Sequence, residues 1–189
     1  MIKRILYLFL SLLLALSLVG CAKTEDEQKQ IMKAAIIHFN EINYKTEKNM
    51  NQMMETFDNK GSNPEVWLDL DNIKNNFNSY KKEVDSIKID DGLSQPRKDT
   101  LERLKKSYSL GIGGLIIFTE SLQEIVKDGK LSNPYKSKDS VKTWGENLGT
   151  GYETLKSLGK EYDVKISATP QYTPKNFPAN CQAKCNFLE

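Results

Sequence analysis

Residues 101–125, with the sequence LERLKKSYSLGIGGLIIFTESLQEI, decide the fold of this 189-residue chain. Alternating steps of three and four residues separate the apolar positions, which places them on one face of an α-helix. Pro96 and Gly129 mark the two ends of the predicted helix, since proline is tolerated in a first turn and glycine stops a last one. The positions on this face are Leu101, Leu104, Tyr108, Gly111, Leu115, Phe118, Leu122 and Ile125.

Three further segments carry the same periodicity. The first ends at Asn59-Lys60-Gly61, the second begins at Asn63-Pro64, and the last begins around residues 137–139, after Asn133-Pro134. Short connections between such helices favour antiparallel neighbours. The sequence therefore predicts an all-α fold over residues 29–166, an antiparallel up-down-up-down four-helix bundle whose first and third helices are longest. The remaining expected core positions are Ile31, Ala35, Phe39, Ile42, Thr46, Met50, Met53 and Phe57, then Val66, Leu70, Ile73, Phe77, Tyr80, Val84 and Ile87, and finally Val141, Trp144, Leu148, Gly151, Leu155, Leu158 and Tyr162.

The N-terminus is typical of an export signal. Lys3 and Arg4 precede an apolar run over residues 5–18, which is shorter than a membrane-spanning helix and is followed by small residues. The motif Leu18-Val19-Gly20-Cys21 resembles the lipobox of bacterial lipoproteins. The resemblance covers 21 residues and implies that residues 1–20 are cleaved, that Cys21 carries the lipid and that residues 21–28 form a tether. It also implies a lipid-anchored, extracytoplasmic location in the bacterial cell envelope, at the outer membrane where the organism has one.

Loss of residues 1–20 also changes the charge. The chain has 27 lysines and arginines and 25 aspartates and glutamates, and the signal holds two of the basic residues, Lys3 and Arg4. The remaining domain carries 25 charges of each sign and is neutral. Nucleic-acid binding requires a concentrated basic surface, so no nucleic-acid partner is expected.

The C-terminal segment, residues 167–189, differs from the rest. Pro170, Pro174 and Pro178 forbid a helix there, so an extended tail is expected. Because Tyr172 and Phe177 are too apolar for a free linker, we expect the tail to lie along the bundle.

Cys181 and Cys185 are spaced as C-x-x-x-C in this tail. A disulfide between them is the preferred interpretation in an exported protein. A metal site built on the two thiolates is the alternative, and it lacks two further ligands.

The residues that usually carry catalysis are few. His38 is the only histidine, and the motifs of serine hydrolases and of phosphate-binding loops are missing. The sequence therefore predicts a protein that is not an enzyme and that holds no cofactor. An enzyme would need carboxylates from different helices to converge, and the candidates for this are Asp69, Asp71, Glu120 and Glu146.

Glycines inside the third and fourth helices are unexpected, because each costs about 1 kcal/mol relative to alanine. Close approach of two helix backbones explains them, and so would a bend in the helices. A third interpretation is a mid-bundle pocket for a small apolar ligand. The residues of this candidate pocket are Tyr108, Gly111, Gly114, Phe118, Trp144, Leu148 and Gly151.

Met50, Met53 and Met54 form a cluster that resembles those of periplasmic copper carriers. Thioethers select Cu(I), which makes these three residues weak candidates for a metal site. Methionine is also a common filler of gaps in a core.

Together these features favour a lipid-anchored helical module that is not an enzyme. Its expected partners are the membrane, through acylated Cys21, and another protein of the envelope. Binding of a small apolar ligand or of Cu(I) by the bundle is the alternative function.

Overall fold

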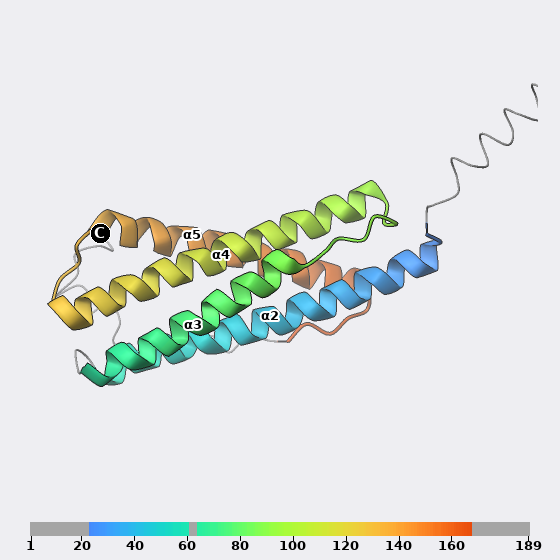
Figure 1. The fold of residues 1–189 in the computed structure, drawn as a ribbon. Coiled ribbons are helices and arrows are strands. Elements are labelled where there is room, and N and C mark those ends of the chain that lie inside the picture. Colours follow the sequence, from blue (N-terminus) through green and yellow to red (C-terminus); the bar gives the residue numbers. More distant parts are fainter. Residues whose placement is uncertain (1–22, 61–63, 168–189) are drawn as a thin grey trace, which may run out of the picture.

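The computed structural model describes residues 23–60 and 64–167, which form a bundle of four α-helices (Figure 1). Helix α2 spans Glu25–Lys60, α3 spans Pro64–Ser86, α4 spans Gln95–Asp128 and α5 spans Pro134–Glu161. Consecutive helices run in opposite directions and pack against each other, so the predicted all-α, up-down fold is confirmed. The first and third of these helices are the longest, with 36 and 34 residues.

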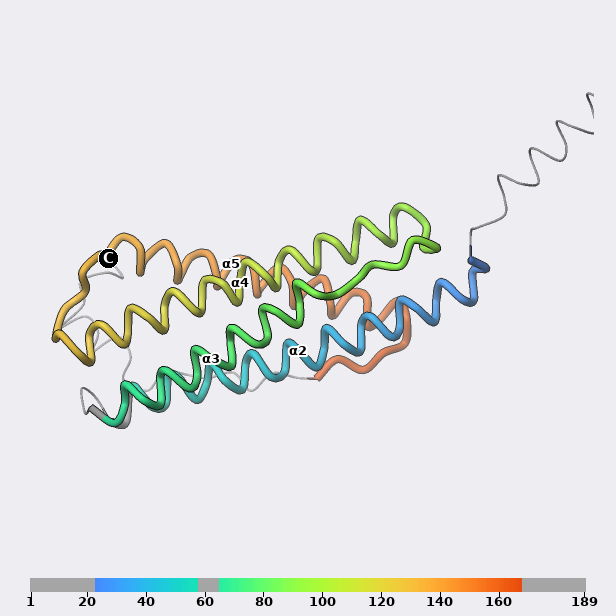
Figure 2. The backbone as a smooth tube through the Cα atoms, viewed as in Figure 1, coloured from blue at the N-terminus to red at the C-terminus, as the bar shows by residue number. Residues whose placement is uncertain are grey.

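Helix α4 is the centre of the bundle. It packs extensively against α3 and α5, whereas α2 packs mainly against α3 and makes small contacts with α4 and α5 (Figure 2). All eight positions predicted for the buried face of α4 are buried. Within the described ranges, α4 is the one helix that is long and apolar enough to span a membrane. An 18-residue stretch of α4 has a mean hydropathy of 1.2, and 56% of that stretch is buried inside the bundle.

Helix α2 begins at Glu25, inside the segment that was predicted to be a tether, and Gln28 is buried. Thr24 and Glu27 form a capping box: the Thr24 amide donates to the Glu27 carboxylate at 2.7 Å, and the Glu27 amide donates to Thr24 Oγ1 at 3.3 Å. These reciprocal bonds satisfy amides that a helix start leaves unpaired. The prediction of a tether over residues 21–28 is therefore wrong from Glu25 onward.

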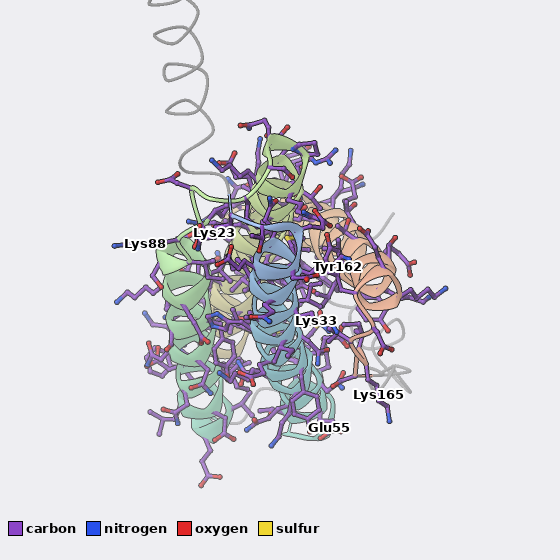
Figure 3. All side chains as sticks on the ribbon, turned by 90° about the vertical axis from the view of Figure 1, so that its right-hand side faces the viewer. Lys23, Lys33, Glu55, Lys88, Tyr162 and Lys165 are labelled. Atoms are coloured by element: carbon purple, nitrogen blue, oxygen red, sulfur yellow. The ribbon has the colours of Figure 1, made fainter. Side chains whose placement is uncertain are left out.

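Side-chain bonds hold this start of α2 to the rest of the bundle. Lys23 forms an ion pair with Asp90 in the α3–α4 connection. Arg97 of α4 pairs with Glu25 and donates from Nε to the Tyr162 hydroxyl at 3.0 Å. Figure 3 looks onto this end of the bundle, where Lys23 and Tyr162 lie on different elements. The first described residues are thus fixed to the α3–α4 connection and to α4, and through Arg97 they are linked to the end of α5.

The buried face of α2 also differs from the prediction near its N-terminus. Met32 and Ile36 are fully buried, whereas the predicted Ile31 and Ala35 are only partly buried. Successive steps of four residues rotate a position by about 40° around the helix, so the predicted stripe drifted to the flank.

Helix α5 begins earlier than predicted. Its first residue is Pro134, because the side chain of Asn133 accepts a hydrogen bond from the Lys136 amide at 3.0 Å and caps the helix there. The C-terminal half of its predicted face is buried, but Val141, Trp144 and Leu148 are only partly buried. The N-terminal half of α5 is therefore less enclosed than the other helices.

Candidate functional site

Close helix approach accounts for three of the glycines in the candidate pocket. A Cβ on Gly111 would lie 2.6 Å from Leu148 Cγ, and one on Gly114 would lie 2.8 Å from the Trp144 backbone nitrogen. A Cβ on Gly151 would lie 3.2 Å from the Tyr108 ring. These glycines bring α4 and α5 together, and neighbouring atoms occupy the space that their side chains would fill.

The aromatic residues of the candidate pocket belong to the core. Tyr108 and Phe118 are fully buried, and the Tyr108 ring stacks on Phe39 with centroids 5.7 Å apart. The Tyr108 hydroxyl donates to Asn43 Oδ1 of α2 at 2.9 Å. Burial raises the pKa of Tyr108 far above its usual value, so the hydroxyl stays a neutral donor. This geometry favours close packing over an internal ligand pocket.

A surface groove runs along the face of α4 that points away from α2. Leu110, Gly113 and Ile117 form its floor. Tyr108 and Thr119 bond to side chains of α2, and helical periodicity places the floor residues on the opposite face. The groove was missed in the sequence because only one face of this helix was considered. The signal that could have revealed it is the pair of apolar residues Leu110 and Ile117, which flank Gly113 on the face opposite the predicted stripe.

The groove consists of two adjoining hollows of about 710 and 560 Å³, which share Ser109 and Leu110. One wall comes from α3 and residues 87–89, and the other from the first turns of α5. Tyr135, on the α5 wall, is 81% exposed. The groove is thus an apolar floor with polar walls and an aromatic side chain at one end.

Lysines dominate the charged groups of the walls. Lys81 pairs with Asp85 at 2.6 Å, and hydrogen bonds from Lys81 and Ser109 hold the pKa of the Asp85 carboxyl below its usual value. Lys88 and Lys106 have no ion-pair partner within the part of the chain that the structure describes. Lysines that line the groove are Lys81, Lys88, Lys105, Lys106 and Lys136, against Asp85, Glu102 and Asp139.

The methionine cluster packs into the bundle. Met53 is fully buried, and its sulfur accepts a hydrogen bond from Thr119 Oγ1 at 3.1 Å. Met50 and Met54 are partly buried and pack against the core. Over residues 23–60 and 64–167, no group of three or more His, Cys, Asp or Glu side chains could hold a metal ion.

The other candidate polar residues lie on the flanks of the bundle. His38 is half-exposed and its Nε2 lies 3.0 Å from the Glu83 carboxylate. Asp71 of α3 bonds to Lys74 and Gln123, which lowers its pKa, and Glu120 of α4 lies 3.8 Å from Lys136. The two remaining candidates also lie apart from any common centre: Asp69 is partly buried on α3, and Glu146 is exposed on α5.

Three predicted sites lie outside the described residues. These are the lipidated Cys21 and the proposed disulfide between Cys181 and Cys185, together with the Pro-rich tail that carries it.

No known protein family, characterised protein or solved structure shows detectable similarity to this chain. The fold defines the class as an all-α, up-down four-helix bundle.

Proposed function

We propose that this chain is a lipid-anchored module of the bacterial cell envelope that binds another protein through the groove along α4. The lipobox supports the anchoring. The groove supports the binding, since it combines an apolar floor with the exposed aromatic side chain of Tyr135. It also contains lysines that have no ion-pair partner among the described residues.

Gly113 is the observation that carries the proposal. Unlike Gly111 and Gly114, it has no close neighbour that would forbid a side chain: an added Cβ would meet only Lys81 Cε, at 3.7 Å. A glycine inside a helix costs about 1 kcal/mol relative to alanine, and nothing within the described bundle requires it here. Its position in the groove floor lets another backbone approach α4 closely.

The partner that fits this groove is an amphipathic helix with acidic flanks. Helices recognise elongated grooves by placing apolar side chains every three or four residues along the floor. Leu110 and Ile117 offer two such contacts on either side of Gly113. Lys88 and Lys106 would pair with acidic residues beside the apolar face of the partner, which favours an acidic over a basic helix.

Membrane crosslinking followed by affinity capture tests the proposal. Gly113→Leu fills the groove floor and is expected to abolish capture of a protein that the unaltered chain retains. Ala34→Leu is the matched control, because it adds the same side chain at an exposed position of α2 outside the groove. Equal capture by both variants, or no specific capture by the unaltered chain, would contradict binding through the groove.

The anchoring is tested separately. Cys21→Ala should leave the chain in the soluble fraction and unlabelled by a palmitate analogue, since acyl chains provide the hold on the bilayer. Cys181→Ala should remain labelled and membrane-bound. Labelling that persists without Cys21 would rule out this residue as the anchor.

A further inference from the structure

The chain turns back sharply where α5 ends. Asp163 has a φ of 53°, in the left-handed region, and the Val164 amide donates to the Gly159 carbonyl at 2.8 Å. The Ile166 side chain packs so tightly on Gly159 that an added Cβ would lie 2.5 Å from Ile166 Cγ1. The turn redirects residues 164–167 away from α5 and along α2 (Figure 2).

Asn40 fixes the direction of this returning segment. The Ser167 amide donates to Asn40 Oδ1 at 2.9 Å, and Asn40 Nδ2 donates to Ser167 Oγ at 3.3 Å. Two bonds to one side chain hold the backbone of Ser167 against α2. The described chain therefore ends at the edge between α2 and α5, pointing toward the C-terminal half of α2.

One buried N–H group on α2 and another on α5 have no acceptor among the described residues. Asn43 is 2% exposed, and its Nδ2 has no hydrogen-bond partner within residues 23–60 and 64–167. The indole Nε1 of Trp144 on α5 is also buried and unpaired among the described residues. Buried N–H groups are rarely left unpaired, so α2 and α5 each have a donor that a further backbone carbonyl would satisfy.

The α5 side of the edge has room for a backbone. Gly145 and Gly149 lie one turn apart, on the opposite flank of α5 from Ser140 and Thr143, which line the α4 groove. Apart from the adjacent residues and the nearby backbone of α5 itself, no described atom lies within 4 Å of the Cβ positions of these two glycines. They form a side-chain-free strip beside Trp144.

We propose that the edge between α2 and α5 is the docking site of the chain's own C-terminal segment, residues 168–189. Pro170, Pro174 and Pro178 each offer a carbonyl and no N–H, which suits helices that have spare donors. The segment follows directly on Ser167, which Asn40 already holds against α2.

The length of the segment is sufficient. From Asn40 to the end of α2 at Lys60 is about 30 Å, at about 1.5 Å per residue. An extended Pro-rich chain advances about 3.1 Å per residue, so about ten residues cover that distance. Residues 168–178, which carry all three prolines, would follow α2, and Cys181 and Cys185 would lie at the far end of the bundle.

Photo-crosslinking in the full-length, membrane-bound chain tests this docking. Benzoylphenylalanine in place of Tyr44, one turn beyond Asn40 and 47% exposed, should crosslink to a peptide from residues 168–189 of the same chain. The same probe at Leu68, 62% exposed on α3, should not. The proposal is overturned if the Tyr44 probe captures no C-terminal peptide, captures another molecule instead, or gives the same result as the Leu68 probe.

A second pair of variants separates this docking from partner binding in the groove. Gly149→Phe places a large side chain at the α2–α5 edge and should abolish the Tyr44 crosslink, whereas Gly113→Phe fills the groove and should leave it intact. Partner capture should show the reverse pattern. Loss of the crosslink in both variants, or in neither, would contradict docking of the C-terminal segment at this edge. Circular dichroism establishes that both variants remain helical.

Discussion

At the scale of single residues, adjacent glycines of α4 have opposite surroundings. Gly114 faces the backbone of α5 at Trp144 and Ser140, whereas Gly113 faces the open groove. The sequence GIGG over residues 111–114 made all three glycines look alike. Only their neighbours in space distinguish the glycines needed for packing from the one that leaves a surface free.

Alanine substitutions at these two positions should change stability in opposite directions. Gly114→Ala places a Cβ 2.8 Å from a backbone nitrogen, which cannot move alone, and should cost about 1–3 kcal/mol. Gly113→Ala should stabilise the protein by up to about 1 kcal/mol, because it improves helix propensity without a clash. Urea denaturation measures both values, and destabilisation by Gly113→Ala would show that this position is packed.

The bond between Tyr108 and Asn43 gives a second prediction. Tyr108→Phe leaves Asn43 Oδ1 buried without its donor and should destabilise the bundle by about 1–3 kcal/mol. Combining it with Asn43→Leu removes both buried polar groups, so the double variant should lose less than the sum of the single losses. Additive losses in thermal unfolding would mean that the two side chains do not interact.

At the scale of helices, the starts of α2 and α5 are fixed by side chains that precede them. Thr24 caps α2 and Asn133 caps α5. Both signals are visible in the sequence, as Thr24-Glu25-Asp26-Glu27 and Asn133-Pro134. The apolar stripes of both helices begin several residues later. Charged first turns carry no apolar pattern, so periodicity alone places a helix start too late.

Thr24→Ala should loosen the start of α2. It removes the Oγ1 that accepts from the Glu27 amide and should cost about 1 kcal/mol. Hydrogen exchange should become faster in the first two turns of α2 and stay unchanged at its centre. Thr150→Ala, at an exposed position within α5, should not accelerate exchange there. A uniform change along α2 would contradict a local role for the cap.

At the scale of the whole molecule, carboxylates with lowered pKa values link different elements. Hydrogen bonds from Lys23 and the Gly92 amide lower the pKa of Asp90, and bonds from Lys81 and Ser109 lower that of Asp85. Bonds to the Ser132 hydroxyl and amide lower the pKa of Glu124. Each group therefore releases its proton more easily in the folded than in the unfolded chain.

Stability should consequently fall in acid. A lowered folded pKa adds stability that is fully present above the unfolded value, 3.8 for Asp and 4.5 for Glu. This stability is lost as the pH falls through these values toward the folded ones. The midpoint of thermal unfolding should therefore be nearly constant from pH 7 to about 5 and decrease below it. Asp90→Asn should weaken that decrease, and an unchanged pH profile would exclude Asp90 as a contributor.

The sequence predicted the topology but not the asymmetry of the bundle. Four stripes and short connections suffice for an up-down order. The groove on α4 and the loose edge between α2 and α5 depend on how closely each pair of helices approaches. That distance is set by contacts such as Gly111 on Leu148 and Gly114 on Trp144, which join residues far apart in the chain.

The capping box at Thr24 limits how far the protein can move from the bilayer. With Cys21 acylated as we propose, three peptide units separate the lipid from the cap, a reach of about 11 Å even when fully extended. Helix α2, with 36 residues, is about 54 Å long. The link between the lipid and the bundle would be much shorter than the bundle itself. A partner would therefore contact the groove only within about one bundle length of the membrane. Membrane-bound partners would therefore gain an effective concentration that freely diffusing ones lack.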